Sequence, residues 1–394
     1  LNILFFAFAA LMIVTVGMGD PGKISQAVND FFGWKPNKPL DGRFVDEQEA
    51  AELRALVSRI NEQGVTADIE RFAAFGSRVP GYPGERQAYE YVRQRFEELG
   101  LEDVESEAFE VAVPMDRGAE LLIEGGVRKQ LYSLWPNGVR TSSLPEGGID
   151  GPLIYGGKGE LKELDGQVVE GGVVLLDFSG GQNYLNPASL GAKAVVFYDN
   201  GGVNREQAAD KFLKVSVDIP RFWIEREDAL ALIAEVEAGP VDVHLNARMD
   251  WQGVETRNLY GWLPGSAEML PEKSRENPQA WKDQVIVIQA YYDAISVVPA
   301  LAPGAENAAG IVAMLQLIET LKAHRPHYSI LFLATSGHFE GLSGINDFLY
   351  RHSRRSDYFR EHMAEDQHID FDLMLSLDLS SHADLTASFG MGTF

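Results

Sequence analysis

The sequence contains no cysteine in its 394 residues. This absence excludes disulfide bonds, thiolate nucleophiles and zinc sites built from cysteine, all of which need that side chain. It leaves the redox compartment of the protein undetermined.

Basic residues are scarce relative to acidic ones. The chain has 34 Lys and Arg against 58 Asp and Glu, a formal net charge of -24. Phosphate backbones are bound by clustered Lys and Arg, so the composition argues against nucleic acid as a partner. An anionic membrane surface is disfavoured for the same reason. With 45% hydrophobic and 23% charged residues, the chain has enough apolar material for two globular domains.

Charge is missing altogether from the first nineteen residues, Leu1 to Gly19. At 1.5 Å per residue, a helix of this length nearly spans a hydrocarbon core of about 30 Å. A cleavable signal peptide is the alternative, but its apolar stretch is usually shorter and ends in small residues. We therefore expect residues 1–19 to be a single-pass transmembrane anchor, with the globular part on the extracytoplasmic side, periplasmic or extracellular.

The next segments predict a tether and then the start of a globular domain. Residues 20–60 contain three prolines and a charged stretch, which indicate a juxtamembrane spacer with a surface helix. A helix is expected from Pro83 to Leu99, because apolar residues recur there at three- and four-residue steps and Gly100 follows. We assign residues 61–115 to the first part of this domain.

Two patterns of apolar residues follow along the chain. Residues 116–250 hold short apolar runs broken by Gly and Pro, which predict a β-rich insertion; its clearest runs are Val173–Phe178, Ala194–Tyr198 and Ile219–Ile224. Residues 251–394 alternate strands and a helix, which indicates an α/β sheet covered on both faces. The predicted strands there are Val285–Ala290, Ser329–Thr335 and Phe371–Leu377, and the helix contains Ile311, Met314, Leu315, Ile318 and Leu321.

Ionisable residues follow these strands, where functional groups of α/β sheets gather. Asp293 and Asp378 come after strands, Glu306 lies at the start of the helix, and His338 lies in a turn. Taken singly, each has an ordinary structural role open to it, such as a loop cap or a favourable first-turn acid. Their joint order along the chain is more informative.

That order resembles the di-zinc aminopeptidase family, whose relatives include glutamate carboxypeptidase, the transferrin receptor and nicastrin. The resemblance begins at Phe75-Gly76-Ser77-Arg78-Val79-Pro80-Gly81 and extends to about Asp378. It implies a mixed α/β sheet flanked by helices, with residues 116–250 as an inserted protease-associated domain. The segment from Glu255 to Gly265 is similar to the family's return into the catalytic sheet.

The resemblance also implies two zinc ions held by His and carboxylates, and a Glu that activates the bridging water. Tyr291 stands where the family has its first His ligand, while the supporting Asp remains as Asp293. A neutral phenol is a poor zinc ligand, since its reference pKa is near 10. Glu306 stands for the bridging Asp, with one residue fewer before it.

The family's Glu-Glu pair falls on His338 and Phe339 when the downstream Gly341-Leu342 sets the register. A slip of one residue would pair Phe339 with Glu340 instead. Phe has no lone pair to offer a metal. Asp378 matches a retained ligand, whereas the last His ligand should lie beyond residue 394, so we expect this second part of the domain to be incomplete.

Three of the family's positions are therefore degenerate, namely Tyr291, His338 and Phe339, and no catalytic residue, metal or other cofactor is expected. We interpret the chain as a non-catalytic scaffold or accessory subunit whose partners are other membrane proteins. The alternative is an active zinc-dependent hydrolase with a remodelled single-metal site. Its candidate ligands are the remnant residues Asp293, Glu306, His338 and Asp378, since a His with two carboxylates can hold one metal.

Overall fold

The computed structural model describes residues 60–379 with gaps at 124, 213–216, 266–284, 327, 354–367, 370 and 372, together with residues 51, 54, 55 and 58. The predicted transmembrane anchor, and nearly all of the tether, lie outside these residues. Among the described residues, no helix combines the length and apolar character needed to cross a membrane. The chain divides into two units, and everything below concerns the second, Asn61–Phe394.

A mixed β-sheet carries the peptidase-like part. β7 (Asp242–Leu263) pairs antiparallel with β9 (Ser329–Thr335), and β8 (Val285–Tyr291) lies parallel to both β9 and β10 (Leu373–Ser376). The predicted mixed α/β sheet is thus confirmed. Because β8, β9 and β10 are parallel, the residues that follow them emerge at the same edge.

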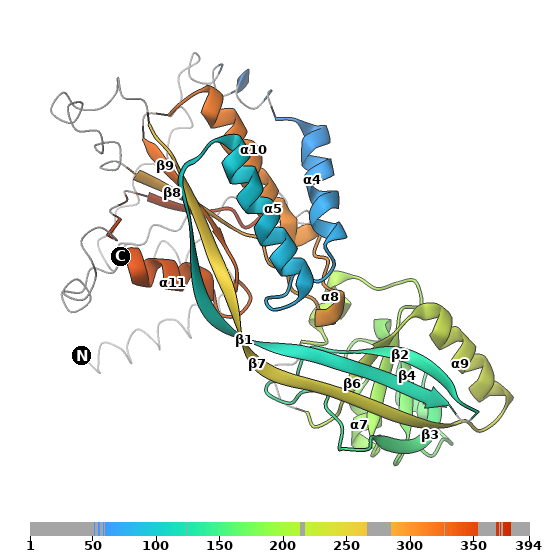
Figure 1. The fold of residues 1–394 in the computed structure, drawn as a ribbon. Helices are drawn as coiled ribbons and strands as arrows, with labels where there is room; N and C mark the ends of the chain where they lie inside the picture. The colour runs from blue at the N-terminus through green and yellow to red at the C-terminus, as the bar shows by residue number, and fades with distance from the viewer. Residues whose placement is uncertain are drawn as a thin grey trace, which may run out of the picture. The chain divides into compact units, whose positions relative to one another are not determined.

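Helices cover both faces of this sheet, as expected (Figure 1). On one face α4 (Glu62–Ala74), α5 (Pro83–Leu99) and α10 (Ala309–Ala323) enclose an apolar core with β8 and β9. On the other face α11 (Ser343–His352) buries Phe348 against Tyr260 and Leu331. Gly100 ends α5 in the left-handed conformation, with φ of 73°, as its position after the last apolar residue predicted.

The helix after β8 begins later than predicted. Glu306–Ala308 form a short 3-10 turn, η5, and the α-helix starts only at Ala309. Gly304 accepts the backbone N–H of Ala308 and has φ of 57°, a conformation that an L residue resists. Glu306 therefore lies in a tight turn at the edge of the sheet.

Two strands of 22 residues each connect the peptidase-like part to a second lobe. β1 (Glu102–Ile123) pairs antiparallel with β7 along most of its length, and both strands cross the domain bounds expected near residues 115 and 250 (Figure 1). Those bounds stay predictions. Strands this long were not predicted, because no single alternation of apolar and polar residues runs through the whole of either one.

The β-rich lobe forms around the far ends of these strands. Its strand order is β1-β2-β6-β5-β4-β3-β7, and the β1–β7 pairing closes the seven strands into a ring. The apolar runs predicted at 173–178, 194–198 and 219–224 are confirmed as β4, β5 and β6, with trimmed ends. Their bounds and those of the remaining elements are β2 (Val127–Ser133), β3 (Ile149–Tyr155), α6 (Leu161–Leu164), β4 (Val173–Asp177), η1 (Phe178–Gly180), α7 (Leu185–Ser189), β5 (Ala194–Tyr198), α8 (Arg205–Ala209), β6 (Arg221–Ile224), α9 (Arg226–Ala238) and η4 (Pro299–Leu301).

Candidate functional site

Three aromatic rings gather where β8 and β9 end. The imidazole of His338 stacks on the phenol ring of Tyr291, with 3.9 Å between centroids and 25° between planes. Phe339 packs edge-on against both rings, at 5.4 Å from Tyr291 and 4.9 Å from His338. The structure thus brings together the three positions that sequence analysis identified as degenerate. We call this group the aromatic cluster.

The Tyr291 hydroxyl is held by Asp378, which follows β10. It donates a hydrogen bond of 2.9 Å to Asp378 Oδ1. Burial and the nearby Asp378 carboxylate both raise the pKa of Tyr291, so the phenol is neutral at physiological pH. Burial lowers the pKa of His338, opposed by Asp378, so its imidazole also favours the neutral form. The aromatic cluster is therefore uncharged, and it lies beside one carboxylate, that of Asp378.

Two acids with buried carboxyl oxygens lie beside the cluster: the fully buried Asp293 and the half-buried Glu340. Asp293 is fully buried, and its Oδ2 accepts the backbone N–H of His338 at 2.9 Å. Among the residues that the structure describes, neither its Oδ1 nor either carboxyl oxygen of Glu340 has a hydrogen-bond partner. Burial raises the pKa of Asp293 well above its usual range, and the charge of Glu340 adds to this effect. Burial likewise raises the pKa of Glu340 to about 7.

Glu340 was not among the candidate site residues predicted from the sequence. The turn that holds it is tight: Leu342 has φ of 59°, and its N–H bonds to the carbonyl of His338 at 3.1 Å. This turn directs the Glu340 side chain inward. The only sequence signal was the alternative register that paired Phe339 with Glu340, and register alone did not predict burial.

A buried arginine fixes the backbone beneath the site. Arg78 is 0% exposed, and its guanidinium donates to the carbonyls of Tyr292, Phe72 and Gly304 at 2.9, 3.2 and 3.1 Å, and also to the carbonyl of Pro303. Burial lowers its pKa to about 10, so it stays charged at neutral pH. The motif around Arg78, which carried the family resemblance, therefore connects α4 to the loops after β8.

Glu85 is a second buried acid that the sequence did not reveal. It lies in the first turn of α5 and its Oε1 accepts hydrogen bonds from Thr256, Tyr292 and Ser336 at 2.6, 3.2 and 3.1 Å. Burial raises its pKa, against the effect of these three donors. An acid near a helix N-terminus is normally a solvated partner of the helix dipole, so only the fold identifies Glu85 as part of the polar core.

Glu306, the expected counterpart of the bridging ligand, turns toward the β-rich lobe. Its Oε1 lies 3.2 Å from Arg205 Nη1 on α8. Glu306 is thus paired with a cation, while Asp378 is paired with a phenol and Asp293 with a backbone amide. The four remnant residues Asp293, Glu306, His338 and Asp378 lie around one strand edge without converging on one point: within the described part of the chain, no three His, Asp or Glu side chains are placed to hold a metal ion.

Zinc ions of the kind that the family resemblance implies do not fit these residues. A zinc site needs about four N, O or S donors around one point. Here the ring of Phe339 supplies none, and the Tyr291 hydroxyl uses its proton on Asp378. The misfit between these residues and zinc follows from the donor atoms that their side chains supply.

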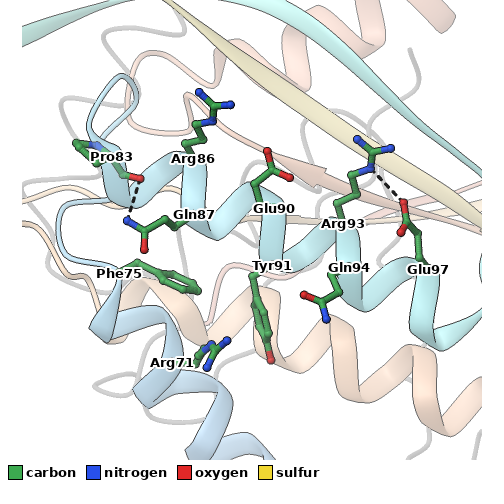
Figure 2. A pocket seen from close by; sticks show the side chains of 10 residues that line it. All are labelled: Arg71, Phe75, Pro83, Arg86, Gln87, Glu90, Tyr91, Arg93, Gln94 and Glu97. Carbon is green, nitrogen blue, oxygen red and sulfur yellow. Dashed lines mark hydrogen bonds and ion pairs between the residues drawn. The ribbon is translucent and has the colours of Figure 1, made fainter.

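A separate hollow of about 770 Å³ lies between α4 and α5, away from the strand ends (Figure 2). Its polar groups satisfy one another: Arg93 pairs with Glu97 at 3.1 Å, and the Arg71 guanidinium lies 5.6 Å from the Tyr91 ring centroid (Figure 2). Such exposed pairs are typical of a solvated helix surface. We assign this hollow no role.

Comparison with solved structures supports the fold. The zinc aminopeptidase from Bacillus subtilis is 20% identical over 81% of this chain and 69% of that chain, with a TM-score of 0.51. The aminopeptidase from Aneurinibacillus sp. strain AM-1 is 20% identical over 81% and 71%, at 0.40, and a peptidase M28 precursor from Shewanella amazonensis is 16% identical over 82% and 72%, at 0.47. A comparison with curated protein sequences gives no match.

The fold is therefore that of a zinc aminopeptidase, a mixed sheet with helices on both faces. Residues 271–381 match the profile described as peptidase family M28. The resemblance drawn from the motifs is confirmed. The match spans Tyr291, Glu306, His338, Phe339 and Asp378.

Proposed function

We propose that this protein is a non-catalytic member of its family and acts as a scaffold or accessory subunit. The observation that carries the proposal is the aromatic cluster, which fills the strand edge with Tyr291, His338 and Phe339. Loss of outer-shell partners alone typically costs 10- to 100-fold in metal affinity or activity. Replacement of the ligands themselves by a phenol and a phenyl ring should have a larger effect.

Metal content is the direct test. We expect protein dialysed against zinc and then against buffer to retain less than about 0.1 zinc per chain, and to release no p-nitroaniline from leucyl-p-nitroanilide. The Bacillus subtilis zinc aminopeptidase serves as the positive control in both assays. Stoichiometric zinc that is lost on Glu306→Ala or Asp378→Ala, together with hydrolysis lost in the same variants, would overturn the proposal.

One observation favours the alternative, an active hydrolase with a single metal. Glu340 is a buried acid with a pKa near 7 and no hydrogen-bond partner, and such perturbed acids cluster at functional sites. A proton acceptor alone does not make a metal site, because the metal needs its own donors. The variant Glu340→Gln tests this candidate: it would abolish any hydrolysis that depends on Glu340 and leave the zinc content unchanged.

The proposed cellular setting is a membrane complex. It is supported by the uncharged segment Leu1 to Gly19, which is long enough to span a bilayer, and by the acidic, cysteine-free composition. Other membrane protein subunits are the proposed partners, with the globular part on the extracytoplasmic side. Membrane fractionation of the chain with and without residues 1–19 tests the anchor: only the full chain should resist extraction by alkaline carbonate.

A further inference from the structure

A cavity of about 730 Å³ lies between the β-rich lobe and the aromatic cluster. The lobe contributes residues of η1, α8 and β6, and the peptidase-like part contributes the loop from Ile295 to Leu301, η5 and Phe339. Its walls are mainly apolar, and four of its lining residues are aromatic: Phe178, Phe212, Trp223 and Phe339. Pockets of 300 to 1,000 Å³ with this composition are typical ligand sites.

Packing from behind fixes these rings. Phe178 contacts Trp223 edge-on at 5.4 Å, and the Lys211 ammonium lies 4.5 Å from the centroid of the Phe178 ring. Phe212 packs against Trp135 at 6.0 Å, and Phe339 is held by Tyr291. The walls are therefore preformed, which lowers the entropy lost when a group enters. Phe339 stands where the family resemblance implies a metal ligand, and its ring also forms part of the apolar wall of the cavity.

The charged residues around the cavity favour one sign of charge on its occupant. Arg205 and Glu306, from the two sides, form an ion pair at 3.2 Å and neutralise each other. Glu225, at the start of α9, is the remaining charged residue of the lining. With a net charge of -24 on the chain, an occupant that carries a positive charge beside its apolar group is favoured.

We propose that this cavity binds a large apolar side chain of a partner protein, preferably aromatic, from a segment with Lys or Arg on either side of it. The inference rests on the proposed function, because it assigns to the former cleft the binding role of a scaffold. An aromatic anchor in a preformed pocket is the usual centre of a protein interface. The basic neighbours contact Glu225.

Short blocked peptides are the probe. In acetyl-Gly-Lys-Xaa-Arg-Gly-amide, labelled with fluorescein at a C-terminal extension, Xaa is Trp, Leu or Ala, and a further peptide places Glu on either side of Trp. Fluorescence anisotropy with the full chain measures Kd. We expect the Trp peptide to bind at least about 10-fold more tightly than the Ala peptide, since most of its buried area is lost on truncation. The Glu-flanked peptide should bind more weakly than the Lys/Arg-flanked one.

Two exposed valines give matched variants. Val203, 39% exposed, lines the cavity, whereas Val168, 79% exposed, lies in the same lobe outside the lining. Val203→Asp should weaken the Trp peptide at least about 10-fold, and Val168→Asp should leave its Kd unchanged, because only the first places a charge in the apolar wall. Both side chains are solvent-accessible, so the fold tolerates either change.

Each remaining outcome decides against the proposal. Equal Kd values for the Trp and Ala peptides, equal loss in both valine variants, or tighter binding of the Glu-flanked peptide would overturn it. Self-association of the chain that Val203→Asp abolishes would make a second copy the occupant and would also overturn it. The leucyl-p-nitroanilide assay keeps the two proposals apart: hydrolysis contradicts the non-catalytic function, whereas absence of peptide binding by a protein that hydrolyses nothing contradicts only this one.

Discussion

Buried charged groups occur in two regions of this protein, and the two regions treat them differently. In the β-rich lobe, Lys211 donates to the carbonyls of Phe178 and Gly181 at 2.9 and 2.6 Å, and Arg221 donates to those of Lys211 and Trp135 at 2.6 and 2.7 Å. At the strand ends, Asp293 and Glu340 keep oxygens without partners.

The difference separates a structural role from a functional remnant. Buried polar groups in folded proteins nearly always have hydrogen-bond partners, so orphaned ones need a specific reason. In the lobe, the buried cations donate hydrogen bonds to carbonyls and lie against aromatic rings. These contacts offset the loss of hydration on burial. At the strand ends, two acids lie beside aromatic side chains, and some of their carboxyl oxygens meet no donor among the described residues.

The largest expected effect lies in the lobe. Arg221→Ala removes a side chain that is 1% exposed and leaves two carbonyls unpaired. We expect the free energy of unfolding to fall by about 4 kcal/mol, from the cavity and the unsatisfied acceptors together. Urea denaturation followed by circular dichroism measures it, with the exposed Arg248→Ala as the control. A loss below about 1 kcal/mol would show that the lobe does not depend on its buried cations.

At the strand ends, removal of a charged group is expected to raise the free energy of unfolding rather than lower it. The pKa of Glu340 rises from 4.5 to about 7 on folding, so the folded state binds more protons than the unfolded state between these values. Stability is then greatest below pH 4.5 and is lost as pH rises through 7. Glu340→Gln should therefore stabilise the protein by about 3 kcal/mol at pH 8.5 and by about 1 kcal/mol at pH 5.5.

Urea denaturation at the two pH values tests this sign. Glu319→Gln, on the outer surface of α10, provides a control that should change stability by less than about 0.5 kcal/mol at either pH. Destabilisation by Glu340→Gln at pH 8.5 would mean that the Glu340 carboxylate has a favourable partner in solution. The two regions would then treat buried charge alike, and the comparison would fail.

A smaller effect is expected within the aromatic cluster itself. Tyr291→Phe removes the hydrogen bond to Asp378 and keeps the ring that stacks on His338. Because Asp378 is exposed, water replaces the lost donor, and the free energy of unfolding should fall by only about 0.5 to 1 kcal/mol. Thermal denaturation is the measurement. A loss of 3 kcal/mol or more would make Tyr291 a structural centre of the site rather than a replaced ligand.

The sequence predicted the sheet well where apolar runs are short and bounded. The predicted run Ser329–Thr335 coincides with β9, and the predicted run Ala194–Tyr198 coincides with β5. Both strands are buried along their whole length, and a buried strand bounded by polar residues gives a clear pattern. β1 and β7 gave no such pattern, since each passes from one lobe to the other and changes its buried face on the way.

The candidate site, like the sheet, was predicted from the sequence only in part. The sequence determined that the side chain at position 339, a Phe, has no donor atom for a metal in any fold, and the order of motifs predicted the family resemblance. Tertiary structure alone decided the rest: that Tyr291, His338 and Phe339 stack together, that Glu306 faces Arg205, and that Glu85 and Glu340 are buried. The physical reason is that a residue type fixes which donors and rings exist, whereas burial and pairing depend on segments up to 251 residues apart, such as Glu85 and Ser336.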